Sequence, residues 1–418
     1  MKKRVLLLSN GYGEDSFAAL ILEELLKCAE NEKLVLLVDI IPLVGEGKAF
    51  ENLCSRFPER VRLLHISPPL PYGGVYLGNP VNRCFRLFAD LFSGGLKNIL
   101  TVAHLVRSSS ATYNLIFGVG DVLPLLLGFL FGRKRMHLFA CAHTDLLRMK
   151  KRPYERLGRF TACLLRHGTA QVYTRDAPTA LWFQKLGIKA TFLGFVGPKM
   201  GEPSPQRRYL LFLPGHREDW RRNFLFLAQV IVLTGQALNS FVPHFVFPLE
   251  RTLAEIENAF IQAGGKRCTS SSFLLGGHCV SFSRGDYFSR LQEAALVVGF
   301  AGTALEHAAF WGIPCIEPYL EGNIQANPDF LFRRQHLLLR EALTPGGTTP
   351  EETAEILGTV LGDLPNFQRR AQEFSLKTWG GKSDGAKNIA CDLLNTLRNL
   401  PEYQDRAPVW GGFHSGTQ

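Results

Sequence analysis

The chain has 418 residues, of which 46% are hydrophobic and 20% charged, so it is long enough for two globular cores of about 200 residues each. Lys and Arg number 47 and Asp and Glu 37, which gives a formal net charge of +10. This composition excludes fibrous and low-complexity proteins, and the charge favours an anionic partner such as a nucleotide, a nucleic acid or an anionic membrane surface.

The nine cysteines are scattered and form no Cys-x-x-Cys pair, which favours a reducing compartment and argues against a structural zinc site. No window holds the ~20 uninterrupted apolar residues of a membrane-spanning helix. The nearest run, residues 122–131, is half that length and is interpreted as a buried helix. The apolar run near the N-terminus is only four residues long, so we interpret it as a first strand rather than a signal peptide.

The chain opens with the pattern of a βαβ unit. Residues 4–10 and 34–41 are expected to be strands, and an apolar stripe between them predicts a helix to about residue 30. The turn after the first strand carries three notable residues, Gly13, Glu14 and Asp15. With Asp39 in the second strand it weakly imitates a dinucleotide fingerprint, although two carboxylates would repel a pyrophosphate there.

A third strand is expected at residues 61–66, followed by a Pro/Gly-rich loop over residues 67–80. The stretch from Asn82 to Val106 is rich in Phe and Leu and carries several basic residues. It predicts one or two basic amphipathic helices, which either pack on their own domain or lie at a membrane interface.

Polar residues follow two further strands of this half. The strand at residues 113–117 ends in a glycine-rich turn that leads to Asp121, and the strand at residues 136–142 leads to His143. Such positions point into the crevice where open α/β sheets bind ligands. The alternative for Asp121 is that it caps the helix beginning near residue 122.

A helix at 153–167, a strand at 170–174, a helix at 177–186 and a strand at 190–196 complete the expected first domain, residues 1–200. Residues 197–208 hold three prolines and two glycines without apolar periodicity and are interpreted as a linker.

The α/β pattern then restarts in an expected second domain, residues 201–378. A strand at 209–213 leads through Gly215, His216 and Arg217 into a helix from about residue 220. A glycine and an arginine at a helix entrance suit an anion. Strands at 241–247 and 278–282 and helices at 252–263 and 286–295 follow.

The stretch Leu296–Tyr319 is the most informative of the chain. It predicts a buried strand, a tight glycine turn and a helix capped by Thr303, whose free N–H groups suit a phosphate. Gly302 lets the backbone approach a ligand, and Glu306 can accept hydrogen bonds from ribose hydroxyls. The alternative is an ordinary strand-to-helix turn with a solvated glutamate.

After this stretch, Gln325 lies in a polar loop and can offer its amide to sugar hydroxyls, or it is an ordinary turn residue. Helices are expected at 350–363 and 365–379. A last helix within residues 379–400 is expected to cross back to the first domain, and residues 401–418 are expected to be disordered.

Two α/β domains joined by a Pro/Gly linker describe a GT-B glycosyltransferase: an α/β protein with two Rossmann-like, doubly wound domains facing a central cleft. From about residue 4 to about residue 395 the chain resembles lipid-A-disaccharide synthases, and more closely the proteins related to them. Five motifs carry the resemblance: Gly13-Glu14-Asp15, Phe117–Asp121, Leu193–Gly197, Leu213–Arg217 and Gly302–Glu306.

The resemblance implies roles for several residues. It makes Asp121, or alternatively His143, the general base, and Arg217 the ligand of the donor diphosphate. It assigns Gly302, Thr303 and Glu306 to the nucleotide pocket, with Gly215, His216 and Gln325 beside them, and places Gly13, Glu14 and Asp15 on the acceptor side. His216 stands where the family usually has Ser, and the residues after Asp121 also differ from the family motif.

The predicted activity is therefore an inverting, metal-independent hexosyl transfer from a nucleoside diphosphate sugar, expected to be UDP-linked, to a lipid or lipid-like acceptor. No cofactor, metal or nucleic acid is expected, and the protein is expected in the cytoplasm, at the inner face of a membrane. Three alternatives remain: a UDP-sugar 2-epimerase of the same architecture, a dinucleotide-dependent oxidoreductase, and a non-catalytic lipid- or nucleotide-binding protein.

Overall fold

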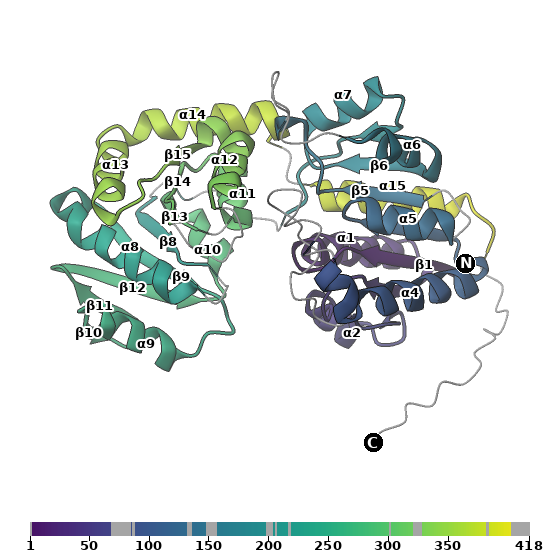
Figure 1. Cartoon of the computed structure of the whole chain (residues 1–418), viewed down its shortest axis with the longest axis horizontal. Coiled ribbons are helices and arrows are strands. Elements are labelled where there is room, and N and C mark those ends of the chain that lie inside the picture. Colours follow the sequence, from purple (N-terminus) through teal and green to yellow (C-terminus); the bar gives the residue numbers. More distant parts are fainter. Residues whose placement is uncertain are drawn as a thin grey trace. The chain divides into compact units, whose positions relative to one another are not determined.

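The computed structural model describes residues 2–67, 85, 88–131, 136–147, 157–197, 204, 207–215, 219–300, 302–320, 328–381 and 384–402, with the backbone alone for residues 12 and 328–333. The chain divides into two compact units (Figure 1). Unit 1 comprises Met1–Asp145, Glu155–Val196 and Asp384–Gln418, and unit 2 comprises Leu146–Tyr154 and Gly197–Ser383. The predicted disordered tail lies outside the described residues from residue 403 onward.

Unit 1 is built on a sheet of seven strands, paired in parallel in the order β3-β2-β1-β4-β5-β6-β7. Its strands are β1 (Lys2–Ser9), β2 (Val35–Pro42), β3 (Val61–Leu63), β4 (Leu115–Val119), β5 (Met136–Ala140), β6 (Thr169–Thr174) and β7 (Ala190–Thr191). The order reverses between β1 and β4, so their carboxyl ends form the switch point where doubly wound sheets bind ligands.

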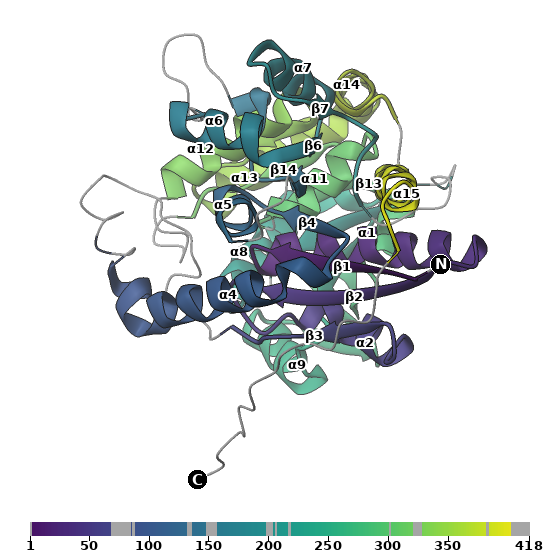
Figure 2. The ribbon, with the colours of Figure 1, turned by 90° about the vertical axis from the view of Figure 1, so that its right-hand side faces the viewer.

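Helices cover both faces of this sheet because its strands are apolar on both sides (Figure 2). Side chains such as Val5 and Leu7 pack with α1, α2 and α15, whereas Leu6 and Leu8 pack with α4 to α7. The helices are α1 (Tyr12–Asn31), α2 (Glu51–Arg56), α4 (Leu96–Ser109, preceded by a π-helical turn Leu91–Gly95), α5 (Val122–Leu130), α6 (Arg159–Gly168), α7 (Ala177–Lys185) and α15 (Gly385–Arg398).

A buried ion pair fixes the centre of β2. Asp39 is 2% exposed and accepts hydrogen bonds from Arg4 Nε (2.9 Å), from the Tyr113 hydroxyl (2.9 Å) and from Arg62. A carboxylate held in this way is not free to bind a ribose, so the dinucleotide alternative loses the acidic residue on which it depended.

Unit 2 is built on a sheet of eight strands in the order β10-β11-β12-β9-β8-β13-β14-β15. The strands are β8 (Tyr209–Leu213), β9 (Val242–Phe247), β10 (Lys266–Thr269), β11 (Ser272–Leu275), β12 (His278–Arg284), β13 (Ala294–Gly299), β14 (Cys315–Glu317) and β15 (Leu343–Pro345). Neighbours among β12, β9, β8, β13, β14 and β15 pair in parallel, and β10 and β11 add an antiparallel edge. The order reverses between β8 and β13.

The helices of unit 2 form two layers around this sheet, with α8, α9 and α13 on one side and α10, α11, α12 and α14 on the other (Figure 1). They are α8 (Trp220–Thr234), α9 (Leu253–Gln262), α10 (Tyr287–Gln292), α11 (Gly302–Phe310), α12 (Pro328–Leu339), α13 (Pro350–Gly362) and α14 (Leu364–Trp379). Phenylalanines dominate the first layer: ring centroids lie 4.7 Å apart for Phe224 and Phe245, and 4.5 Å for Phe260 and Phe273.

The predicted elements differ from the structure mainly at their ends. The expected strand at 190–196 contains only the two residues of β7, because the chain then passes through Gly194, whose φ is +117°. The expected helix at 286–295 stops at Gln292, since Ala294 already begins β13. The hairpin of β10 and β11 was not predicted; β10 is exposed throughout and has no apolar period to detect.

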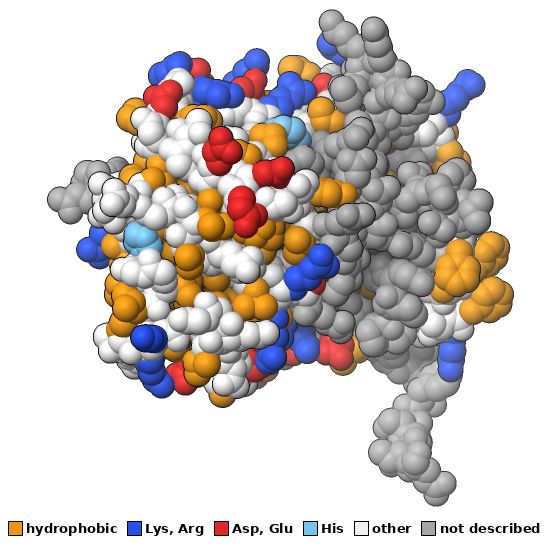
Figure 3. Space-filling model, turned by 60° about the vertical axis from the view of Figure 1, so that its left-hand side comes forward, with side chains coloured by type: hydrophobic (Ala, Val, Ile, Leu, Met, Phe, Trp, Pro, Cys, Tyr) orange, Lys and Arg blue, Asp and Glu red, His pale blue; other side chains and the backbone are white. Residues whose placement is uncertain are grey.

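Among the helices that the structure describes, none combines the length and apolarity needed to cross a membrane. In the space-filling view of Figure 3, basic, acidic and hydrophobic side chains are interspersed over the described surface. The net charge of +10 is therefore not gathered into one patch on the face shown.

Candidate functional site

The switch point of unit 1 brings two turns together. The amide of Asn10, after β1, donates to the carbonyl of Val119 (3.0 Å), and the amide of Gly120 donates to the carbonyl of Phe139 (3.0 Å). Gly11 has a φ of +116°, and a Cβ there would lie 2.5 Å from the carbonyl oxygen of Val44. Only glycine fits this corner, which directly precedes α1. The predicted acidic residues Glu14 and Asp15 therefore lie in the first turn of α1 and not in a loop.

Two of the predicted carboxylates are tied to backbone or hydroxyl donors. Asp121 is the N-cap of α5 and accepts a hydrogen bond from the amide of Leu123 (3.1 Å), so the helix-capping interpretation is confirmed. Asp15 is 3% exposed and accepts a hydrogen bond from the Ser9 hydroxyl. Burial raises the pKa of Asp15 to about 6.

Glu14 is the carboxylate at the centre of the cluster. Burial raises its pKa above the usual value, the charges of Asp121 and Asp15 raise it further, and the guanidinium of Arg175 lowers it. Glu14, Asp121 and Arg175 therefore share one electrostatic environment at the carboxyl edge of the sheet. Beside them, Gly13 has no atom within 4 Å of the position a Cβ would take, so the turn is open at that residue.

Arg175 is a functional candidate that the sequence reasoning missed. It follows β6 directly, and its Nη1 donates to the carbonyl of Cys141 (3.1 Å), just beyond β5. The signal was present: a charged residue at the carboxyl end of a predicted strand, as for Asp121. A small cavity beside it is lined by Phe17, Phe139, Cys141, Arg175, Phe195 and Val196.

His143, the alternative base, is half-buried after β5, and its ring packs edge-on against Phe183 of α7 with centroids 6.3 Å apart. The next residue, Thr144, donates from its hydroxyl to Asp176 (2.7 Å), the N-cap of α7. This segment is thus anchored to the start of α7, whereas Asp121 lies at the start of α5.

The switch point of unit 2 lies between β8 and β13. The amide of Phe300 donates to the carbonyl of Leu213 (3.0 Å), and a Cβ at Gly299 would lie 2.5 Å from that same oxygen. Gly215, just after β8, has a φ of +89°, and no atom of the residues that the structure describes lies within 4 Å of the place a Cβ would take. The predicted donor residues Gly215 and Gly302 therefore follow two neighbouring strands at the same edge of the sheet.

Helix α11 begins at Gly302, two residues before the start that a cap at Thr303 implies, so Thr303 lies in the first turn and is not the cap. Thr303 is exposed and Glu306 half-buried. The carbonyl of Gly302 accepts a hydrogen bond from Gln335 Nε2 (3.0 Å), and the hydroxyl of Tyr287 donates to the carbonyl of Ala304 (2.5 Å). These two bonds fix the orientation of the helix start, whose N–H groups suit an anion.

Three predicted donor residues, His216, Arg217 and Gln325, lie outside the described residues. The neighbouring turn is anchored by Asn223, a buried residue of α8 whose amide donates to the carbonyl of Pro214 (2.9 Å).

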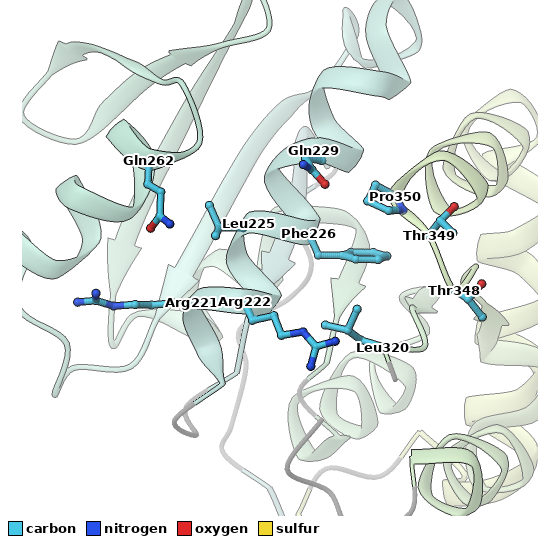
Figure 4. A pocket seen from close by; sticks show the side chains of 10 residues that line it. All are labelled: Arg221, Arg222, Leu225, Phe226, Gln229, Gln262, Leu320, Thr348, Thr349 and Pro350. Carbon is cyan, nitrogen blue, oxygen red and sulfur yellow. The ribbon is translucent and has the colours of Figure 1, made fainter. Parts of the chain in front are cut away.

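A groove of about 580 Å³ opens on the α8 side of unit 2 (Figure 4). One of its walls is Phe226, whose ring centroid lies 5.7 Å from that of Phe300 in the glycine turn. The groove therefore borders the predicted donor turn. Its lining comes from α8, α9 and the loops after β14 and β15: Arg221, Arg222, Leu225, Phe226, Gln229, Gln262, Leu320, Thr348, Thr349 and Pro350. None of these residues was predicted as part of the site.

Within the part of the chain that the structure describes, no group of three or more His, Cys, Asp or Glu side chains could hold a metal ion.

No protein-family model and no curated protein matches the chain. Solved structures do match over nearly its whole length. The UDP-GlcNAc 2-epimerase of Neisseria meningitidis, solved with UDP-GlcNAc bound, has a TM-score of 0.52 and 13% identity over 94% of this chain and 99% of that one. A Polygonum tinctorium UDP-glucosyltransferase capable of glucosylating indoxyl has a TM-score of 0.57 and 11% identity over 96% of this chain and 99% of that one.

Identities this low carry the fold and nothing finer. The chain has the α/β fold of these enzymes, two Rossmann-like units each built on a largely parallel sheet, and this is the GT-B fold predicted from its sequence.

Proposed function

We propose that the protein is a glycosyltransferase that moves a hexose from a UDP-sugar to a lipid or lipid-like acceptor, as its resemblance to lipid-A-disaccharide synthases implies. The observation that carries the proposal is the switch point of unit 2, where the Gly215 turn and the start of α11 follow adjacent strands. Backbone N–H groups and helix dipoles at such a point stabilise a diphosphate leaving group.

On the donor side, Glu306 lies one turn into α11 and receives the ribose hydroxyls, and Arg217 completes the diphosphate site. On the acceptor side, Asp121 removes the proton of the attacking hydroxyl, with His143 as the alternative base. Glu14 is the other carboxylate in the environment of Asp121, and Arg175 is its nearby cation.

A lipid acceptor is supported by an exposed apolar stripe in unit 1. Phe88 and Phe92 lie on the helical segment before Gly94, and Leu96 and Leu100 lie on α4 after it; they are 55%, 84%, 51% and 61% exposed. Gly94, with a φ of +113°, interrupts the helix between the two pairs. The rings of Phe88 and Phe92 stack with centroids 6.3 Å apart. Exposed apolar side chains on a helical segment of the surface suit contact with a membrane, from which a lipid acceptor would be taken.

The test is turnover of UDP-GlcNAc, and then of other UDP-sugars, with and without a membrane lipid extract. We expect UDP release that depends on the extract, together with a glycolipid product detected by mass spectrometry. Asp121→Asn should retain UDP binding and lose turnover by about 10²–10⁴-fold. Arg217→Ala should weaken both UDP binding and turnover. If Arg217→Ala left donor hydrolysis and transfer unaffected, the donor assignment would be wrong.

A second candidate is a UDP-sugar 2-epimerase, favoured by the likeness to the Neisseria meningitidis enzyme. It would need no acceptor. Incubation of the protein with UDP-GlcNAc alone in deuterated water separates the two reactions, because inversion at C2 breaks the C2–H bond and leaves deuterium in the sugar. Tight UDP-sugar binding with neither reaction would instead indicate the non-catalytic alternative.

A further inference from the structure

Glu317 is a half-buried residue with one inaccessible carboxyl oxygen, and the reasoning above gives it no role. It is the last residue of β14, which lies between β13 and β15 in the sheet of unit 2. Val298 pairs with Ile316, and Glu317 pairs with Pro345. Glu317 therefore lies at the level of Gly299, at the carboxyl edge of the sheet and next to the switch point.

The alternation of side chains along β14 shows which face Glu317 occupies. Ile316 packs into the core that α8 and α13 cover, so Cys315 and Glu317 face the opposite layer. The thiol of Cys315 donates to the carbonyl of Leu305 in α11 (3.6 Å). Two residues along the strand is about 6.6 Å, and the three residues back along the helix from Leu305 to Gly302 rise roughly 4.5 Å. Glu317 thus lies beside the first turn of α11, where Gly302 begins the helix.

One oxygen of this carboxyl group has no described hydrogen-bond partner. Glu317 Oε2 is inaccessible to solvent and makes no hydrogen bond in the part of the chain that the structure describes. The backbone of the residue is fixed, because its carbonyl accepts a hydrogen bond from the amide of Gly346 (2.7 Å). A buried polar atom without a partner is costly and uncommon, and such atoms often mark the place of a ligand.

We propose that Glu317 belongs to the nucleotide-sugar site of unit 2 and that its carboxyl group, in the neutral form, donates a hydrogen bond to an oxygen of the bound nucleoside diphosphate sugar. This inference rests on the function proposed above and adds to it a residue that the sequence reasoning did not select.

The surroundings favour the neutral form. The elements packed most closely on β14 are β13, β15 and α11, and β13 and β15 contain no titratable side chain. Glu306 and His307 are the titratable residues of α11, and Cys315 is the other one of β14, with a thiol whose pKa is raised by burial. Burial also raises the pKa of Glu317, to about 8. An ionised carboxylate would repel a diphosphate, whereas the neutral acid can donate to it.

The sign of the pH effect follows from this ionisation. Below pH 8 Glu317 is protonated and supports binding; above pH 8 it becomes charged and opposes binding. The affinity of the wild-type protein for the nucleotide sugar should therefore fall as the pH rises from 7 to 9. Glu317→Gln keeps a donor of the same shape and cannot ionise, so its affinity should not show this fall.

The experiment is calorimetric titration of the full-length protein with UDP-GlcNAc and with UDP at pH 7 and pH 9. At each pH, the association constant of the wild type is divided by that of Glu317→Gln, and this ratio cancels the ionisation of the ligand itself. We expect this ratio to fall about tenfold between the two pH values. An effect on both ligands would place the partner oxygen in the UDP part, and an effect on UDP-GlcNAc alone would place it in the sugar. Glu351→Gln, an exposed carboxyl group of α13, is the matched control.

A second measurement follows the carboxyl group in the wild-type protein itself and uses the variant only to assign its band. The infrared band of a protonated carboxyl group, assigned by its loss in Glu317→Gln, should shift when UDP-GlcNAc is added to wild type at pH 7. A pH-independent ratio, or a band that ligand does not move, would show that Glu317 lies outside the site while leaving the proposed function in place. Absence of any UDP-sugar binding by wild type would overturn both.

Discussion

Two buried aspartates of unit 1 show how the surroundings of one residue type decide its role. Asp39 is 2% exposed and surrounded by cationic and hydroxyl donors. Asp15 is 3% exposed and its described side-chain donor is the neutral hydroxyl of Ser9. Asp39 is therefore a structural ion pair, whereas Asp15 carries a charge that burial opposes.

Removal of Asp39 should be strongly destabilising because it leaves a charge without its partner. The Arg4 side chain is only 8% exposed and lies 2.7 Å from Asp39 through Nη2. We expect Asp39→Ala to lower the free energy of unfolding by roughly 3–5 kcal/mol. Arg62, whose side chain is 52% exposed, provides the control: Arg62→Ala should cost less than about 1 kcal/mol. Urea denaturation of both variants measures this, and equal costs would contradict it.

Asp15 should make stability depend on pH in the opposite sense to a salt-bridged aspartate. Its pKa rises from 3.8 to about 6 on folding, so the folded state binds a proton more readily between these values. Wild type should therefore lose stability relative to Asp15→Asn as the pH rises from 4 to 7, by up to about 3 kcal/mol. At pH values where Asp15 is protonated in both the folded and the unfolded state, the difference in unfolding free energy between wild type and Asp15→Asn should no longer change with pH. Thermal denaturation across this range decides it, and parallel pH profiles would show that Asp15 is not the titrating group.

At the scale of elements, α15 belongs to unit 1, although the chain between Gly197 and Ser383 that precedes it belongs to unit 2. It packs on α1, and Ile389, Leu393 and Leu397 are fully buried there. A polar chain also ties it to the sheet: His137 Nδ1 lies 2.9 Å from the Tyr173 hydroxyl, which donates to Asp392 (2.5 Å). Burial lowers the pKa of His137 to about 4, so the ring is neutral and donates to the tyrosine oxygen.

Tyr173→Phe should loosen α15 without changing the apolar packing. The change removes the hydroxyl between His137 and Asp392 and leaves both polar groups without it, so we expect a loss of about 1–3 kcal/mol. Hydrogen exchange of the α15 amides should accelerate more than that of α8 in unit 2. Arg398→Ala, which removes only a partly exposed contact to Glu32, is the control and should cost about 0–1 kcal/mol. Equal acceleration in both units would contradict a local role for this chain of bonds.

The elements that could be predicted from sequence are those with a long period or a continuous apolar run. Helix α1 and strand β13 both lie close to where the pattern placed them. A helix buried on one face shows a helical apolar period, and a strand buried on both faces shows a continuous apolar run. Strand β10 could not be predicted, since all four of its residues are exposed and only its pairing with β11 makes it a strand. The start of α11 was missed by two residues, because Thr303 has the residue type of a cap whereas Gly302 gives no sign of a helix start.

At the scale of the whole molecule, the two switch points were predictable and the side chains that complete them were not. The glycines Gly11 and Gly299 indicate a tight corner in the sequence, because a residue with a Cβ does not fit at either position. Arg175 and Glu317 join their clusters through the order of the strands in each sheet, which local patterns do not reveal. A polar residue at the end of every predicted strand is therefore worth considering before the strand order is known.

The chain also combines a net charge of +10 with the exposed apolar stripe of unit 1, and we expect these two features to contribute separately to membrane binding. We expect the protein to bind vesicles that contain anionic lipids, with an affinity that falls as salt screens the charge. Phe92 is 84% exposed and Phe88 55% exposed, so inserting both rings into the lipid would bury substantial apolar area.

The double variant Phe88→Ser and Phe92→Ser should weaken vesicle binding at least about tenfold and leave the salt dependence and UDP binding unchanged. Leu249→Ser, a 67% exposed apolar residue of unit 2, is the control in cosedimentation. If the double variant bound as tightly as wild type at high salt, the stripe would not be the membrane contact, and the lipid acceptor would lose its support from the structure.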